Sequence, residues 1–152
     1  MEGCVVEGID FSDTMVSISR RKNRKHIKKG KVLVHKGNID EISITAEMYT
    51  KICSVNTIYF WPNPETTTRN IARLLKPGGI LVLGFEDIAQ LEKRQLDTDV
   101  FRLYAVYDVE TLLIEAGFTG AVTTNSIRFD SSVFHCTAAT KNKELNHDFD
   151  SL

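Results

Sequence analysis

Short apolar runs alternate with stretches of helical periodicity along most of this chain. The apolar runs predict six strands, at Cys4–Ile9, Lys31–His35, Lys51–Ile58, Ile80–Phe85, Ala121–Thr124 and Ser132–Ala139. Strands that alternate with helices indicate an α/β fold with a mostly parallel sheet. The last two strands are separated by a turn, so they are expected to form an antiparallel pair at one edge of that sheet.

Helix start and stop signals occupy the segments between the strands. Asn63, followed by a proline, predicts the start of one helix, and the turn Lys76–Gly79 predicts its end. The clearest helix is expected to be capped by Asp108 and to end at Gly117. Its apolar residues recur at i, i+3, i+4 and i+7, at Val109, Leu112, Leu113 and Ala116.

Composition changes this picture little. With 152 residues, 42% of them hydrophobic and 26% charged, the chain is expected to form one globular domain over residues 1–140, followed by a polar tail over residues 141–152. The net charge of -1 gives no general attraction to nucleic acid or membranes. The segment Arg20–Lys31 carries eight lysines and arginines in twelve residues, and a solvated helix end is favoured over a nucleic-acid site. We expect neither nucleic acid nor a membrane as a partner.

Cysteine and histidine positions indicate no metal site. The three cysteines, Cys4, Cys53 and Cys136, have neither metal-binding nor redox spacing, and the four histidines form no ligand set. No signal peptide or membrane span is recognised. The cysteines are therefore interpreted as reduced residues of a cytoplasmic protein.

An acid at the end of the first strand is the first candidate for a binding role. Asp10 follows an apolar run, and Ser12 or Asp13 is then expected to cap a helix. In a nucleotide-binding α/β unit, such a carboxylate can accept hydrogen bonds from both ribose hydroxyls. An ordinary strand end with an exposed aspartate is an equally open interpretation of these residues.

Five motifs, taken together, carry a family resemblance. They are Gly8–Ser12 with Met15, Gly37–Ile39, Ser54–Trp61, Arg73–Gly79 and Glu115–Phe118. In this order and spacing, over nearly all of residues 5–139, they resemble the class I S-adenosylmethionine-dependent methyltransferases. The resemblance implies a Rossmann-like fold, S-adenosylmethionine as cofactor and a small-molecule methyl acceptor.

The resemblance also implies roles for single residues. Asp10 would hold the ribose, Phe11 would pack on adenine, and Ser12 would lie beside them in the cofactor site. Asn38 would meet the adenine amino group and the Ile39 amide a ring nitrogen. The methionine portion would lie next to Asn56. The substrate side would be formed by Tyr59, Phe60 and Trp61, for which core packing is the alternative.

This sequence departs from the family pattern in three places. Asn38 and Thr50 stand where an acid is usual, and neither change excludes the cofactor. The larger departure is that only residues 1–3 precede the first predicted strand, where the family has a strand, a glycine-rich loop and a helix. The resemblance therefore implies a truncated domain that lacks its first strand–helix unit and with it the central strand of the sheet.

The lost central strand leads to an expectation about pairing. The strands Val5–Ile9 and Ile52–Asn56 would otherwise expose unpaired edges, which invite association. We expect them to pair with each other, with their copies in a homodimer, or with a complementing N-terminal chain.

The sequence thus predicts a methyltransferase domain for a small molecule, weakly active or inactive alone. No universal catalytic residue is expected, because methyl transfer depends mainly on orientation. His35, Tyr59 or Asp87 could accept a proton, although a structural role is favoured for each. A non-catalytic remnant of the fold that serves dimerisation or partner binding is the alternative, and a nicotinamide-dependent dehydrogenase ranks third.

Overall fold

The structure is a computed structural model that describes residues 3–41, 46–94, 96–97, 100–130 and 132–142. The chain divides into two compact units, residues 1–43 and 44–152, and each is described by itself. Most of the expected polar tail, residues 143–152, lies outside the described residues. No helix in the described ranges is both long and apolar enough to cross a membrane.

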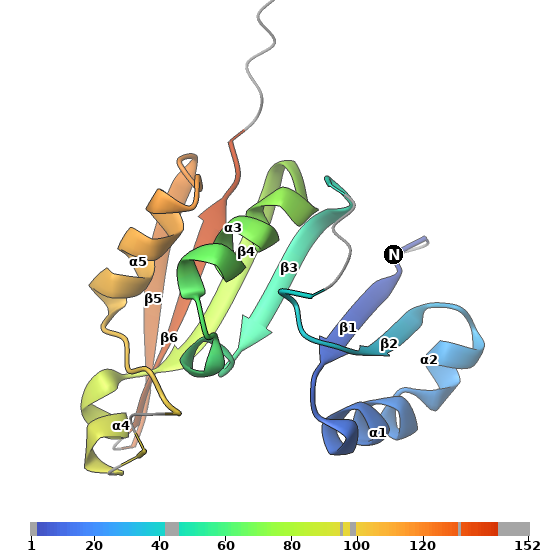
Figure 1. Cartoon of the computed structure of the whole chain (residues 1–152), viewed down its shortest axis with the longest axis horizontal. Helices are drawn as coiled ribbons and strands as arrows, with labels where there is room; N and C mark the ends of the chain where they lie inside the picture. Colours follow the sequence, from blue (N-terminus) through green and yellow to red (C-terminus); the bar gives the residue numbers. More distant parts are fainter. Residues whose placement is uncertain (1–2, 42–45, 95, 98–99, 131, 143–152) are drawn as a thin grey trace, which may run out of the picture. The chain divides into compact units, whose positions relative to one another are not determined.

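The first unit is a small parallel β-α-α-β arrangement (Figure 1). Strand β1 (Val6–Asp10) is followed by α1 (Asp13–Lys22), α2 (Arg24–Lys28) and β2 (Val32–Lys36). The two strands pair in parallel, from Val6 opposite Val32 to Asp10 opposite Lys36. Their carboxyl ends therefore lie side by side at one edge of a two-stranded sheet.

The basic segment of the first unit belongs to its helices. Residues 20–22 form the last turn of α1, where positive charge complements the helix dipole, and residues 24–28 form α2. The Arg20 guanidinium donates two hydrogen bonds to the Val34 carbonyl oxygen, at 2.9 and 3.3 Å. One cation of this segment thus fastens α1 to β2.

In the described residues, the second unit contains a four-stranded mixed sheet and four helices, one of them a 3-10 helix. In chain order it comprises β3 (Tyr49–Val55), the 3-10 helix η1 (Ile58–Phe60), α3 (Pro64–Leu74), β4 (Leu75–Glu86), α4 (Ile88–Lys93), α5 (Val106–Glu115), β5 (Ala121–Phe129) and β6 (Ser132–Thr140). The strand order is β3-β4-β6-β5. Strand β3 runs parallel to β4, while β6 is antiparallel to both β4 and β5. The predicted antiparallel pair at the end of the chain is confirmed.

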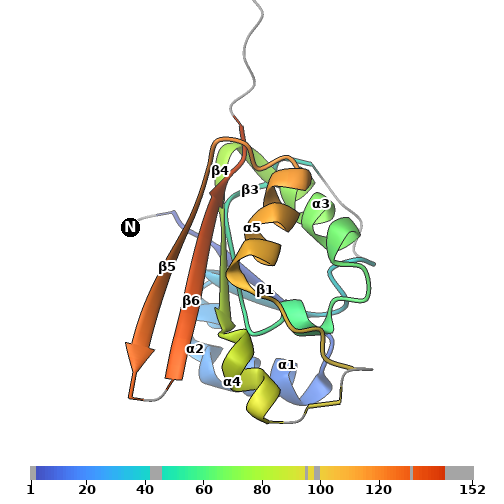
Figure 2. The same ribbon diagram turned by 90° about the vertical axis from the view of Figure 1, so that its left-hand side faces the viewer.

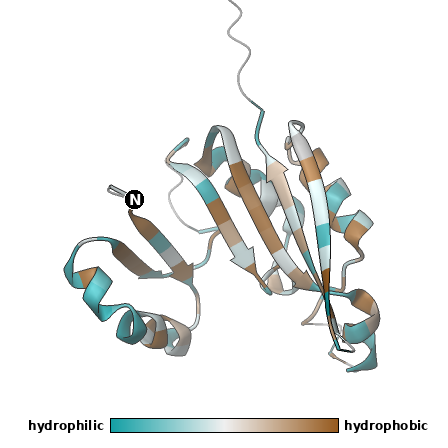
Figure 3. Ribbon diagram, turned by 180° about the vertical axis from the view of Figure 1, so that it is seen from behind, coloured by the Kyte–Doolittle hydropathy of each residue, from teal (hydrophilic) through white to brown (hydrophobic). Residues whose placement is uncertain are grey.

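Helices α3 and α5 cover one face of this sheet (Figure 2). Side chains of a strand alternate between the two faces, and Leu81, Leu83 and Phe85 of β4 are buried beneath these helices. Val82, on the opposite face, is half-buried. That opposite face is seen in Figure 3, where apolar residues recur along β4. The core of the second unit therefore lies between the sheet and the α3–α5 layer.

Two sequence-based boundaries are wrong in detail. Asp108 is not the cap residue of α5 but lies in its first turn, where its carboxylate accepts a hydrogen bond from the Ala105 amide at 2.9 Å. Lys76–Gly79 ends α3 as predicted, but it belongs to β4, which begins at Leu75 opposite Tyr49 and is irregular there. An acid in the first turn of a helix can accept a hydrogen bond from the amide of the cap residue, as an acid at the cap position can from the first turn. The sequence therefore places a helix start only to within about one turn.

The expected direct pairing of the first and third strands is not among the strand pairs of the described residues. Strand β1 pairs with β2 in one sheet, and β3 lies at the edge of another. In the described part of the chain, each therefore keeps one open edge, and the two other proposed arrangements, in a homodimer or with a complementing chain, stay predictions.

Candidate functional site

The candidate cofactor residues of the first unit gather where β1 and β2 end. The Gly37 amide donates to the Asp10 carbonyl oxygen at 3.1 Å, which holds the two strand ends together. The Ser12 amide donates to Asp10 Oδ1 at 2.8 Å. Among the described residues, the second carboxylate oxygen of Asp10 accepts no hydrogen bond, so it is available to a ligand hydroxyl.

The residues that follow Asp10 complete one side of this edge. Phe11 is 69% exposed, which is unusual for a phenylalanine and leaves its ring free to contact a flat ligand. Ser12 caps α1, because its Oγ accepts a hydrogen bond from the Met15 amide at 3.4 Å. An ion pair of 2.7 Å between Lys36 Nζ and Asp13 Oδ2 joins the start of α1 to the end of β2.

Asn38 and Ile39 follow β2 at the same edge of the sheet. Asn38 Oδ1 accepts a hydrogen bond from the Asp40 amide at 3.1 Å, which fixes the turn. Both residues are half-buried. The parallel register thus brings Asn38 and Ile39 to the same edge as Asp10, Phe11 and Ser12, and this grouping suits the ribose and adenine parts of a nucleoside. Their individual roles stay predictions.

Asn56, the remaining candidate cofactor residue, belongs to the second unit. It follows β3 with a positive φ of 55°, and its amide donates to the Gly84 carbonyl oxygen at 2.8 Å. The Tyr59 hydroxyl donates to Asn56 Oδ1 at 3.4 Å and accepts from the Glu86 amide at 2.6 Å. Burial raises the pKa of Tyr59, so its hydroxyl stays protonated and can serve both bonds.

The three aromatic residues after Asn56 differ in their surroundings. Tyr59 and Trp61 are buried in the second unit, as the core-packing alternative describes. Phe60 is 41% exposed and packs against Phe101, with ring centroids 4.8 Å apart. Phe60 is therefore the exposed member of the trio, and the substrate-side role of the three stays a prediction.

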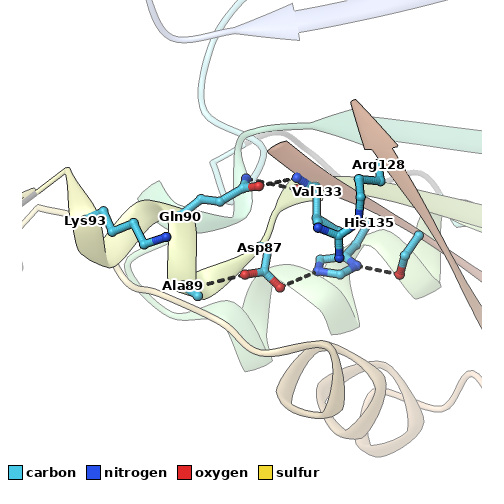
Figure 4. Close-up of a pocket in the computed structure, with 8 residues that line it drawn as sticks. Asp87, Ala89, Gln90, Lys93, Arg128, Val133 and His135 are labelled. Atoms are coloured by element: carbon cyan, nitrogen blue, oxygen red, sulfur yellow. Dashed lines mark hydrogen bonds and ion pairs between the residues drawn. The ribbon is translucent and has the colours of Figure 1, made fainter. Parts of the chain in front are cut away.

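A second candidate site is an open pocket of about 450 Å³ at the carboxyl end of β4 (Figure 4). It is lined by residues of α4, β5 and β6 and by Asp87, which precedes α4. Its centre is a row of three hydrogen-bonded side chains. Asp87 Oδ2 lies 3.0 Å from His135 Nε2, and His135 Nδ1 lies 2.7 Å from Ser126 Oγ. The His135 side chain is only 8% exposed.

Asp87 holds this row in place. Its Oδ1 accepts a hydrogen bond from the Ala89 amide at 2.9 Å and caps α4, which leaves Oδ2 directed at the imidazole. The hydrogen bond from His135 is the main cause that lowers the pKa of Asp87 below its ordinary value, and the Ala89 amide adds to it against the opposing effect of burial. Asp87 is therefore an ionised carboxylate at neutral pH.

The wall of the pocket is fastened by Gln90. Its Nε2 donates to the Val133 carbonyl oxygen at 3.0 Å, and the Val133 amide donates back to Gln90 Oε1. The Asp87 amide donates to the same Val133 carbonyl oxygen at 3.1 Å. The beginning of β6 is thus tied to α4 without help from Ser126 or His135.

Sequence reasoning found one member of this row and missed two. Asp87 is one of the three residues that the sequence offers as a proton acceptor. The other two candidates, Tyr59 and His35, lie in the core and on the exposed side of β2, respectively. Nothing in the sequence singled out Ser126 and His135, because they become neighbours only through the register of β5 and β6.

The fold and the strand-end sites define an α/β domain of the kind that binds nucleotide-like cofactors at the carboxyl ends of parallel strands. The chain belongs to the methyltransferase domain family, whose model matches residues 1–83, more than half of its length. Membership of this family supports S-adenosylmethionine as the cofactor.

Individual relatives agree with this assignment. The uncharacterized methyltransferase YdaC of Bacillus subtilis (strain 168) is 32% identical over 74 residues, which are 49% of this chain and 39% of YdaC. The match to this curated relative thus spans about two fifths of its length.

Two solved structures share the fold. A SAM-dependent methyltransferase from Thermotoga maritima superposes with a TM-score of 0.72 at 22% identity, over 90% of this chain and 72% of its own. Phosphoethanolamine N-methyltransferase 2 of Haemonchus contortus, in complex with phosphomonomethylethanolamine and S-adenosylhomocysteine, superposes with a TM-score of 0.76 at 14% identity, over 91% and 43% of the two chains.

Proposed function

We propose that this chain is a methyltransferase domain that transfers a methyl group from S-adenosylmethionine to a small molecule. The observation that carries the proposal is the cluster at the carboxyl edge of β1 and β2. There Asp10 keeps one carboxylate oxygen free beside the exposed ring of Phe11, and Asn38 follows the neighbouring strand. A ribose hydroxyl and an adenine ring are the groups that such an acid and such a ring can hold together.

Methyl transfer asks the protein mainly for orientation and for exclusion of water. When bound, S-adenosylmethionine supplies an activated methyl group on a positively charged sulfur. The chain's part is to fix the adenosine through Asp10 and its neighbours, and to hold an acceptor in line with the methyl carbon.

We expect these 152 residues to be weakly active or inactive by themselves. These residues contain no glycine-rich loop before the strand that ends at Asp10. Such a loop would bring backbone amides close to the carboxylate of the cofactor's methionine portion. Val16 is the one fully buried residue among those described in the first unit, while Val5 and Val6 are more than half exposed. A complementing N-terminal chain or a second copy in a homodimer, paired with the open edge of β1 or β3, would cover such surface.

A cytoplasmic location is also part of the proposal. Cys4, Cys53 and Cys136 are free thiols, and Cys4 and Cys53 are exposed. Exposed thiols persist in reducing compartments, which the cytoplasm provides.

Cofactor binding tests the function directly. Titration of the full chain with S-adenosylhomocysteine in a calorimeter should show binding that weakens about tenfold to a hundredfold in Asp10→Asn, because one charged hydrogen bond contributes roughly 1.5 to 3 kcal/mol. The matched control is Asp13→Asn. It removes an acid on the same segment whose exposed ion pair with Lys36 contributes little.

Two results would count against the proposal. If the Asp10→Asn and Asp13→Asn variants bound S-adenosylhomocysteine with equal affinity, Asp10 would not be the residue that binds the ribose. Absence of binding to the unaltered chain would favour the alternative, a non-catalytic remnant of the fold that serves as a dimerisation or partner-binding module.

A further inference from the structure

The row formed by Ser126, His135 and Asp87 has a defined direction. An ionised carboxylate can only accept hydrogen bonds, so the proton of the imidazole lies on Nε2, which faces Asp87 at 3.0 Å. In the neutral ring Nδ1 is then an acceptor, and the Ser126 hydroxyl donates to it at 2.7 Å. The lone pairs of Ser126 Oγ are thereby left to accept a hydrogen bond from a molecule in the pocket.

Ser126 is the exposed end of the row. The side chain of His135 is buried and lies against the ring of Phe85, with centroids 5.3 Å apart, so the imidazole also serves the core. Ser126 is exposed on β5, and the ties between α4 and β6 run through Gln90 and Val133 instead. The Ser126 hydroxyl therefore serves the buried imidazole on one side and faces the pocket on the other.

The pocket also carries positive charge. Lys93 of α4 and Arg128 of β5 line it, and both are exposed. Among the described residues neither forms an ion pair, whereas Arg94, next to Lys93, is paired with Glu86 at 2.5 Å. Asp87, the acid of the pocket, already receives hydrogen bonds on both oxygens. Arg128 acts electrostatically on the Asp87 carboxylate without forming an ion pair with it, so both cations can still bind an anionic group of a ligand.

We propose that this pocket is the methyl-acceptor site, and that it takes a small molecule bearing a carboxylate or phosphate and, a few bonds away, an amine or hydroxyl. Arg128 and Lys93 hold the anionic group. Ser126 accepts a hydrogen bond from the amine or hydroxyl, and His135 receives the proton. The catalytic part of this inference rests on the proposed function, whereas the binding part stands on the pocket alone.

Methyl transfer to the acceptor is accompanied by removal of the acceptor's proton through Ser126 and His135. The acceptor nitrogen or oxygen forms a bond to the methyl carbon as the bond from that carbon to sulfur breaks, and the electron pair goes to the sulfur. The acceptor's proton passes to Ser126 Oγ while the Ser126 proton passes to His135 Nδ1. The imidazolium so formed lies beside the Asp87 carboxylate, and water then removes the extra proton.

The binding experiment uses small probes on the full chain, followed by the NMR shifts of the Ala89, Gln90 and Val133 amides. Glycine, glycolate and 2-aminoethyl phosphate carry both groups, while acetate and methyl phosphate carry the anion alone. We expect the probes with both groups to bind about tenfold or more tightly than their anion-only counterparts. The carboxylate and phosphate probes together identify which anion the pocket prefers.

Two variants, each with a matched control, separate the parts of the site. Arg128→Gln should weaken every probe about fivefold to tenfold, whereas Arg69→Gln, an exposed cation on α3, should weaken none. Ser126→Ala should lower the affinity of glycine and glycolate to that of acetate and leave acetate unchanged. Thr123→Val is the matched control on β5, because its side chain faces the other side of the sheet.

Several outcomes would overturn the inference. If all probes bound with the same affinity and Ser126→Ala changed none of these affinities, the pocket would act only as a patch of positive surface charge. If millimolar probe concentrations caused no change in the NMR shifts of these amides, the pocket would not be a binding site for this class of ligand. Methyl transfer to any acceptor that proceeds unhindered while glycine or glycolate occupies the pocket would exclude the acceptor role.

The two proposals fail in different ways. Loss of S-adenosylhomocysteine binding with intact probe binding would contradict the proposed function and leave the pocket's ligand class in place. Intact S-adenosylhomocysteine binding that depends on Asp10, without probe binding, would contradict only the pocket.

Discussion

Two aspartates at strand ends show how far a residue's chemistry depends on its neighbours. Asp10 is the last residue of β1, and Asp87 is the residue after β4, so each lies at the carboxyl end of a strand. Asp10 has one oxygen bonded to the Ser12 amide, whereas both oxygens of Asp87 are engaged, by Ala89 and by His135. The same local pattern therefore yields an acid ready for a ligand in one unit and an acid that orients an imidazole in the other.

The lowered pKa of Asp87 predicts a pH dependence of stability. A carboxyl whose pKa is lower in the folded state stabilises the fold above its ordinary pKa of 3.8, and this contribution is lost as the pH falls through the lowered value. Denaturant unfolding should therefore show the unaltered chain more stable than Asp87→Asn at neutral pH, with the difference shrinking below about pH 4. His135→Gln should behave similarly, because the imidazole is the main cause of the shift. A difference that stays constant down to about pH 3 would contradict this account.

At the scale of elements, α5 shows why periodicity was a dependable guide. Val109, Leu112 and Leu113 form its buried face, as their spacing predicts, and Gly117 ends the helix with a positive φ of 97°. The pattern is reliable here because one face of the helix packs on the sheet and the other meets solvent. The cap was misplaced by one turn, since Asp108 stabilises the helix start from inside it.

Neighbouring residues of α5 allow a matched test of that buried face. Leu113→Ala should lower the free energy of unfolding by about 2 to 5 kcal/mol, because Leu113 is fully buried and its truncation leaves a cavity. Ile114→Ala, one residue further on, should cost well under half as much, since Ile114 is 52% exposed. Equal losses in chemical denaturation would show that α5 is not held by this face.

At the scale of the whole molecule, the two units differ in how much they bury. The second unit has a four-stranded sheet with a helical layer, whereas the first has a two-stranded sheet and one fully buried residue among those described. A two-stranded sheet is marginal alone. The unit that carries Asp10 is therefore the one expected to gain most from a ligand or a partner.

Hydrogen exchange can measure this difference. Amides in β1 and β2 should exchange at least about tenfold faster than those of β4 and β6, because local opening of a small unit costs less than opening of the main core. Addition of S-adenosylhomocysteine should slow exchange at the carboxyl ends of β1 and β2 and change β6 little. Uniform protection across both units would contradict the prediction.

The sequence by itself determined the local features of this protein: the α/β alternation, most strands and helices, the acid at the end of β1 and the family. These features follow from periodicity and from short motifs, which act over a few residues. The tertiary structure decided what depends on distant segments: that β1 and β3 join different sheets, that Tyr59 and Trp61 are buried, and that Ser126 and His135 meet Asp87. The physical reason is strand register, since only the pairing of β4, β5 and β6 places side chains 9 and 48 positions apart within hydrogen-bond distance.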